Sequence, residues 1–187
     1  MINVTDARKG ITVELDGNLY QVLEYEHIKM ARGSATVRLK LKDVRGGHII
    51  EKTFQNNAKL PRARIERLKV EYSYHDGDLW YFMDKETFEQ TPLNDSQVGD
   101  AGQYLTENAP CDLLMYGTEP IGLEVPAAVV LTVAETEPGH KGDTATGGTK
   151  QAKLESGLLV NVPLFINVGD KLKINTSNGD YLERASS

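Results

Sequence analysis

The fold of this chain is decided by residues 19–42, which read LYQVLEYEHIKMARGSATVRLKLK. Residues 19–28 are rich in apolar and aromatic side chains, and from Thr36 onward apolar and polar residues alternate. Alternation with a period of two is typical of a strand that buries one face. The sequence therefore predicts a β-hairpin whose tip is a small basic loop at residues 29–34.

The tip loop holds the first candidate functional residues. Arg32 lies inside it, and the other loop residues that we consider are Lys29, Met30, Ala31, Gly33 and Ser34. An exposed arginine at a hairpin tip is either a solvated turn residue or a contact for an anionic partner, and the first interpretation is the commoner. The rest of the chain has to decide between the two.

The strand after the tip loop carries a second group of cations. Its expected buried face is apolar and consists of Val37, Leu39 and Leu41. Because successive side chains of a strand point to opposite faces, the other face would carry a basic ridge made of Arg38, Lys40 and Lys42. Such a ridge is usually solvated, but its sign matches that of Arg32, which favours contacts with phosphate groups.

Charge is distributed unevenly along the chain, although the formal net charge is only -6. Residues 1–64 hold 12 Lys and Arg against 7 Asp and Glu, residues 65–127 hold 3 against 13, and residues 128–187 hold 6 against 7. A basic end on an acidic body suits a protein that presents one end to a polyanion. Blocks of charge that merely keep small domains soluble are an equally good explanation.

Turn signals between the alternating runs divide the chain into three all-β domains. The polar and basic stretch at residues 56–64 breaks the alternation, and a second break follows near Ala127. We expect three small antiparallel β-barrels in tandem, at residues 1–64, 65–127 and 128–187. One short helix is expected after Asp100, which can cap it, with Gln103 three residues later. Such a chain offers long surfaces without a deep cleft, which favours binding over catalysis.

Composition argues against several other functions. The single cysteine, Cys111, excludes an intramolecular disulfide, and four scattered histidines argue against a zinc site. No run approaches the roughly 20 apolar residues that cross a bilayer, and the first residues lack a signal-peptide pattern. We therefore expect a cytoplasmic protein without metal, cofactor or membrane contact. No catalytic motif is visible, so we expect no enzyme, although a site assembled only in space stays open.

A glycine-rich loop at residues 142–150, GDTATGGTK, has the glycine spacing of a phosphate-binding loop. That motif needs a lysine directly after its second spaced glycine. Gly148 occupies this position and Lys150 comes two residues late, so we reject nucleotide hydrolysis. A simple connection between strands, or a surface loop that touches RNA, remains as an interpretation.

Several longer stretches resemble bacterial elongation factor P, and they extend over essentially the whole chain. They are HIKMARG at 27–33, VRGG at 44–47, EKTF at 51–54, YHDGDLWYFM at 74–83, ETFEQ at 86–90, PGHKGDTA at 138–145, SG at 156–157 and VPLF at 162–165. The resemblance implies an L-shaped, tRNA-like monomer with an SH3/KOW-like first barrel and two OB-fold barrels.

The resemblance also implies a function and a set of partners. Such a factor binds the ribosome between the peptidyl and exit sites, touching ribosomal RNA and peptidyl-tRNA, and relieves stalls at consecutive prolines. Arg32 would be the tip residue that steadies the acceptor end of peptidyl-tRNA, and the other loop residues would shape the tip. The loop that would face the small subunit near the exit-site codon consists of Gly142, Asp143 and Thr144.

The tip departs from the commonest family pattern in two ways. Many relatives carry an enzymatically extended lysine there, whereas Arg32 places this chain beside a branch whose arginine is modified with rhamnose. Met30 and Ala31 also replace the usual Pro-Gly, which makes the loop less constrained and bears on recognition by a modifying enzyme. Two alternatives stay open: an elongation-factor-P-like paralogue with an Ala-Arg-Gly tip, and a general module for structured RNA.

Overall fold

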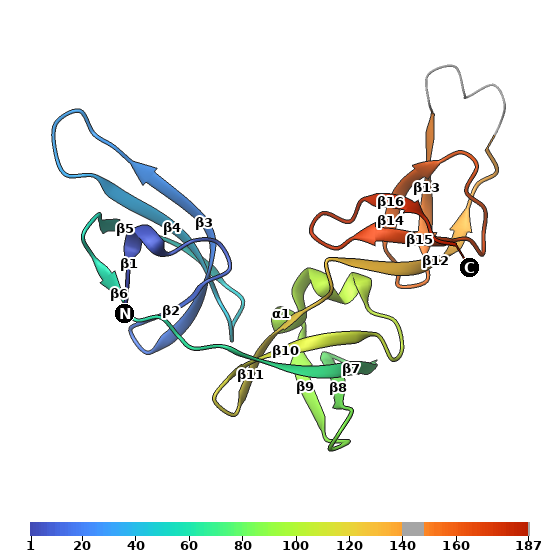
Figure 1. The fold of residues 1–187 in the computed structure, drawn as a ribbon, viewed down its shortest axis with the longest axis horizontal. Coiled ribbons are helices and arrows are strands. Elements are labelled where there is room, and N and C mark those ends of the chain that lie inside the picture. The colour runs from blue at the N-terminus through green and yellow to red at the C-terminus, as the bar shows by residue number, and fades with distance from the viewer. Residues whose placement is uncertain (140–147, 187) are drawn as a thin grey trace. The chain divides into compact units, whose positions relative to one another are not determined.

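The computed structural model describes residues 1–139 and 148–186. Its described part is built mainly from β-strands (Figure 1), so the expected all-β fold is confirmed. The chain divides into two compact units. The first consists of Met1–Leu68, Leu93–Gln97 and Leu113–Gly122, and the second of Lys69–Pro92, Val98–Asp112 and Leu123–Ser187.

The first sheet is a four-stranded meander with the strand order β2-β3-β4-β5. Its strands are β2 (Thr12–Leu15), β3 (Asn18–Ile28), β4 (Thr36–Asp43) and β5 (Ile49–Gln55). The predicted alternation on β4 is confirmed, because Val37, Leu39 and Leu41 are fully buried in the core. The polar residues between them therefore point away from the core.

Two short strands and a 3-10 helix complete the elements of the N-terminal segment. β1 (Ile2–Asn3) pairs with β6 (Lys59–Leu60), and η1 (Val4–Asp6) follows β1. The chain after β6 stays attached to the first sheet: the N–H of Glu14 donates to the carbonyl of Pro61 at 2.9 Å. An isolated bridge also joins Val13 to Arg62. The predicted boundary at residue 64 remains a prediction.

The middle sheet has five strands in the order β11-β10-β7-β8-β9, and it supplies residues to both compact units. Its strands are β7 (Glu66–Asp76), β8 (Leu79–Asp84), β9 (Gln90–Asn94), β10 (Pro110–Tyr116) and β11 (Glu119–Glu124). The side chains of Phe82, Leu93 and Leu113 are fully buried. Each comes from a different strand of this sheet.

The helical stretch begins earlier than predicted. α1 (Asp95–Val98) and η2 (Gly99–Tyr104) follow β9, so Asp100 lies inside η2 and does not begin the helix. A capping box operates six residues upstream: the N–H of Gln97 donates to Asn94 Oδ1 and the N–H of Asn94 to Gln97 Oε1, both at 2.9 Å. The type of signal was right, but the helix starts where β9 ends.

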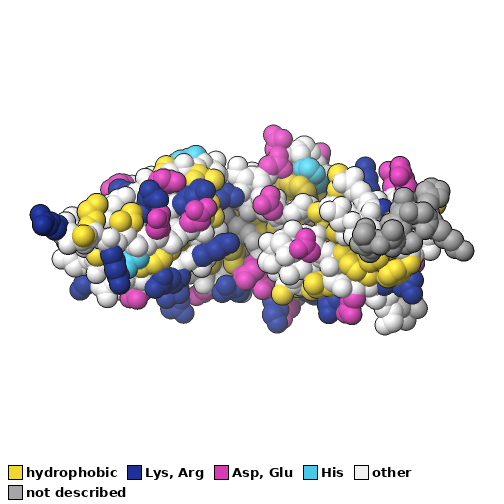
Figure 2. Space-filling view, turned by 90° about the horizontal axis from the view of Figure 1, so that it is seen from above, with side chains coloured by type: hydrophobic (Ala, Val, Ile, Leu, Met, Phe, Trp, Pro, Cys, Tyr) yellow, Lys and Arg dark blue, Asp and Glu magenta, His cyan; other side chains and the backbone are white. Residues whose placement is uncertain are grey.

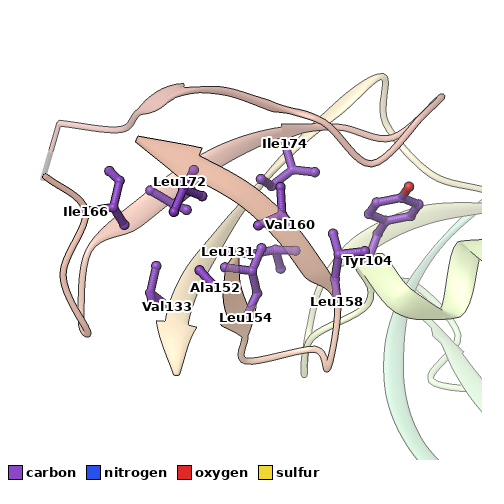
Figure 3. Packing of buried hydrophobic residues seen from close by; sticks show 11 residues of the cluster. Tyr104, Leu131, Val133, Ala152, Leu154, Leu158, Val160, Ile166, Leu172 and Ile174 are labelled. Atoms are coloured by element: carbon purple, nitrogen blue, oxygen red, sulfur yellow. The ribbon is translucent and has the colours of Figure 1, made fainter. Parts of the chain in front are cut away.

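The third sheet also has five strands, in the order β14-β13-β12-β15-β16. They are β12 (Ala128–Thr136), β13 (Thr149–Leu154), β14 (Leu159–Pro163), β15 (Lys171–Asn175) and β16 (Tyr181–Arg184). Inward side chains from these strands form one apolar cluster (Figure 3). Tyr104 of η2 is also part of the cluster, and its ring lies beside Leu158. Within the described residues, no helix is long and apolar enough to cross a membrane.

Candidate functional site

The predicted hairpin is present, and its tip is fully accessible. β3 and β4 pair in antiparallel register down to Ile28 opposite Thr36, which leaves residues 29–35 as the connecting loop. In Figure 1 this loop, drawn in light blue, extends beyond the other strands of the first sheet. All residues from 29 to 34 are exposed, and Met30 exposes 62% of its surface. The loop is thus available to a partner.

Two hydrogen bonds anchor the loop on the side where it enters β4. Ser34 Oγ donates to Gln55 Oε1 at 3.0 Å, and the N–H of Asn56 donates to the carbonyl of Ala35 at 3.0 Å. Gly33 has a φ of +133°, a backbone conformation that favours glycine. The C-terminal side of the loop is therefore tied to the end of β5, while Met30 and Ala31 have no proline to restrain them.

The cations of the tip differ from those of the ridge in their partners. Within the described residues, neither Lys29 nor Arg32 forms an ion pair or a side-chain hydrogen bond. Figure 2 shows lysine and arginine side chains over the part of the chain that holds the first sheet, interleaved with acidic side chains. Among the described residues, the hairpin cations without a partner are therefore the two in its tip loop.

Each of the three ridge cations has a partner. Arg38 Nη2 contacts Glu26 Oε2, Lys40 Nζ lies 3.0 Å from Glu24 Oε1, and Lys42 Nζ donates to the carbonyl of Ser96 at 3.2 Å. The hydrogen bond to Glu26 raises the pKa of Arg38, and the bond to Glu24 raises that of Lys40. The predicted contact of this ridge with phosphate remains a prediction, and it would compete with nearby carboxylates.

Hairpin register explains why these acidic partners were missed. β3 pairs with β4 so that Glu26 lies opposite Arg38 and Glu24 opposite Lys40, while Glu51 of β5 lies on the other side of Lys40. The alternation of the strand from Thr36, taken by itself, predicts a basic ridge without partners. Pairing the two strands across the predicted loop places the same acidic residues opposite the ridge, so the signal was available.

The glycine-rich loop, the possible metal ligands and Cys111 provide no second candidate site within the described residues. Gly142, Asp143 and Thr144 lie outside the described residues. Among residues 1–139 and 148–186, no group of three His, Cys, Asp or Glu side chains could hold a metal ion. Burial raises the pKa of the Cys111 thiol to about 12, which keeps it protonated and unreactive at neutral pH. The tip is therefore the strongest candidate site.

Three family models match consecutive parts of the chain. The elongation factor P (EF-P) KOW-like domain fits residues 3–60, the elongation factor P OB domain fits residues 65–123, and the elongation factor P C-terminal model fits residues 129–184. Together with the β-sheets that occupy these segments, the matches define a translation elongation factor.

Relatives that match over the whole chain agree with the domain matches. Elongation factor P of Moorella thermoacetica is 52% identical over 185 residues, which cover 99% of this chain and 100% of the relative. That of Dictyoglomus thermophilum is 50% identical with the same coverage. The chain belongs to the elongation factor P family.

Part of the chain is also similar to a solved structure. Eukaryotic translation initiation factor 5A from Methanococcus jannaschii is 19% identical, with a TM-score of 0.49, covering 67% of this chain and 90% of that chain. A similarity at this level supports no argument. The family assignment rests on the domain matches and the relatives of comparable length.

Proposed function

We propose that this elongation factor binds the ribosome between the peptidyl and exit sites. There, Arg32 steadies the acceptor end of peptidyl-tRNA and so speeds peptide-bond formation at consecutive prolines. Membership of the elongation factor P family supports a role in translation elongation, and the exposure of the tip loop supports the choice of Arg32. The single observation that carries the proposal is that Arg32 is exposed and has no partner among the described residues, whereas the ridge cations on the same hairpin have partners.

The chemistry of an unpaired guanidinium suits this role. It is planar, permanently charged, and presents five donors that match phosphate oxygens. Arg32 has no hydrogen bond to another described residue to give up when it meets a nucleic acid, while Arg38 would first have to leave Glu26. Attraction to RNA is therefore strongest at the tip of the hairpin and weaker along its side.

The factor acts by positioning the end of peptidyl-tRNA, because the ribosome supplies the reacting groups. Restricting reactants to a productive orientation is worth up to about 7–11 kcal/mol in ideal model reactions. Every 1.4 kcal/mol, roughly, is a tenfold change in rate, so even a small share of that effect relieves a stall.

Arg32 is also the residue that we propose as the target of a modifying enzyme, with rhamnose as the added group. The intact mass of protein purified from its own host tests this directly. An excess over the mass calculated from the sequence supports a modification, and fragmentation assigns it to Arg32. An unmodified mass overturns this part of the proposal without affecting the role of the tip.

Translation of a proline-run reporter with purified ribosomes tests the main proposal. The native protein should raise the yield, and Arg32→Ala should remove that gain. Lys52→Ala is the matched control, because Lys52 is a cation of the same sheet that lies 3.7 Å from Asp16. Equal loss in both variants would mean that general positive charge, and not the tip, matters.

The same variants separate a ribosomal factor from a general module for structured RNA. A general module binds unrelated folded RNAs with similar affinity, and its binding weakens steeply with salt. A factor that acts through the tip loop alone should bind isolated RNA hairpins weakly. Tight binding of such hairpins, unchanged in Arg32→Ala, would favour the general module.

A further inference from the structure

The turn between β4 and β5 is built around one carboxylate. Asp43 Oδ1 accepts hydrogen bonds from the N–H of Arg45 at 2.8 Å and of Gly46 at 2.7 Å. Burial acts to raise the pKa of Asp43, but these two donors and the nearby charges of His48 and Arg45 lower it below its ordinary value. The turn is thus held in one shape while the carboxylate stays charged.

This turn presents Arg45 to β11. Arg45 Nε lies 2.6 Å from Glu119 Oε1 and Nη2 lies 2.9 Å from Glu119 Oε2, so the guanidinium and the carboxylate form two parallel bonds. These bonds lower the pKa of Glu119. Two parallel hydrogen bonds fix the relative orientation of the guanidinium and the carboxylate as well as their distance. The single ammonium of a lysine cannot reproduce this geometry.

The same turn contacts the start of α1. Lys42 Nζ donates to the carbonyl of Ser96, and Gly47, at φ +79°, leaves only 2.8 Å between its own Cβ position and Ser96 Cβ. Gln97 Nε2 in turn donates to the carbonyl of Pro120 at 3.1 Å, beside Glu119. We call residues 42–47, together with Ser96 and Glu119, the clamp.

Apolar contacts accompany the clamp. A small buried cluster consists of Leu19, Ala63 and Ile121, with Val44, Ile65, Leu114 and Tyr116 packed against it. Its residues come from the segment that matches the KOW-like domain, from the segment that matches the OB domain, and from the short stretch between them. All of them belong to the first compact unit, as do the residues of the clamp.

We infer that Arg45 and Glu119 are positioning residues for Arg32, an inference that rests on the proposed function. The clamp holds one end of β4, and the tip loop leaves the other end. The eight residues of β4 span about 25 Å at roughly 3.3 Å per residue. A tilt of about 10° at the clamp therefore moves the tip by about 4 Å, whereas misplacement by about 1 Å can cost 100-fold in rate.

A distance measurement tests the positional claim without reference to translation. Cys111 is buried, so spin labels on Ala31→Cys and Thr118→Cys report the separation of the tip from the β10–β11 turn. We expect a narrow distribution in this labelled protein and a broader or shifted one after adding Arg45→Lys or Glu119→Gln. The control is Lys52→Gln, which disrupts a different ion pair of the same sheet.

The reporter assay then tests the functional claim. Arg45→Lys and Glu119→Gln should lower the stimulated yield about threefold to tenfold, with a melting temperature close to that of the native protein. The exchanged pair Arg45→Glu with Glu119→Arg should recover part of the loss. If the exchanged protein does not fold, the Arg45→Lys variant alone tests the positioning role, because it keeps the positive charge and loses the two parallel hydrogen bonds.

The outcomes separate this inference from the proposed function. Unchanged distances, or broadened distances with a native reporter yield, overturn the positioning role. If Arg32→Ala has no effect on the reporter, the proposed function fails, and the distance measurement still decides whether the clamp orients the tip. Loss of the reporter gain in Arg32→Ala, together with its partial loss in both clamp variants, supports the proposed function and the positioning role.

Discussion

The two connections of the OB segment are made in different ways. In the first compact unit the clamp joins it to the KOW-like segment through Arg45 and Glu119, whose side chains remain 41% and 42% exposed. In the second unit Tyr104, only 4% exposed, enters the apolar cluster of the third sheet. Ser156 Oγ adds a hydrogen bond to the carbonyl of Gln103 at 2.5 Å.

The difference shows how direction and stability can be provided separately. Burial of an aromatic ring is strongly stabilising, but the hydrophobic effect has no preferred direction. An exposed ion pair contributes little free energy, while two parallel hydrogen bonds fix the relative orientation of the groups that carry them. The clamp, which holds the end of β4 opposite the tip loop, is therefore the connection that fixes orientation.

The largest effect is expected at the apolar connection. Tyr104→Ala removes a buried ring from the cluster beside Leu158, and truncating a buried aromatic side chain typically costs about 3–5 kcal/mol. Urea unfolding should show the loss. Tyr104→Phe keeps the ring and should retain most of the stability. An unchanged unfolding curve for Tyr104→Ala would mean that the ring is not part of the stable structure.

Gly47→Ala should give the next largest effect, because it strains the clamp in two ways. The left-handed backbone costs roughly 1–2 kcal/mol for a residue with a Cβ, and the new methyl group would meet Ser96 at 2.8 Å. Gly17→Ala is a matched control, since Gly17 has the same φ of +79° and nothing within 4 Å of its Cβ position. The difference in unfolding free energy between the two variants measures the contact with Ser96.

Glu119→Gln should have a smaller effect, below about 1 kcal/mol, because the pair with Arg45 is exposed. The pKa of Glu119 is lowered from its ordinary value of 4.5, so the native state favours the charged form. Its contribution is present above that value and disappears as the pH falls through the lowered pKa. The difference between native protein and variant should therefore vanish in acid. A difference that persists there would contradict the ion-pair explanation.

Arg32→Ala should change stability least of all, by no more than about 0.5 kcal/mol, because its side chain is exposed and touches neither connection. Thermal unfolding followed by circular dichroism is a sufficient measurement. Combined with a lost reporter yield, an unchanged melting temperature assigns Arg32 to binding. A parallel loss of stability would show instead that the loop supports the sheet.

The hairpin was predictable because its signal is local. The buried face of β4 follows from a period of two, and the loop at residues 29–34 follows from the break in that pattern. The pairing of Arg38 with Glu26 was missed because it needs the register of two strands. The helix was misplaced because the capping pattern at Asp100 and Gln103 resembles the one that forms at Asn94 and Gln97.

The clamp could not be predicted from the sequence. Arg45 and Glu119 are 74 positions apart, and nothing near either residue indicates the other. Their contact depends on the shape of the β4–β5 turn, on the start of α1 and on the packing of Ile121. The proposed role of Arg32 is the reverse case, since a family resemblance suggested it and no residue of the described part of the chain pairs with its side chain.

The paired carboxylates beside Arg38 and Lys40 also bear on how long the factor stays bound. Affinity differences between related complexes arise mostly in the dissociation rate. Under the proposed function, a hairpin whose Arg38 and Lys40 are paired with carboxylates would bind RNA mainly through its tip and only weakly along its sides. We expect release after each round to be rapid. Replacing Glu24 and Glu26 by Gln should then slow dissociation, and added salt should restore the native rate.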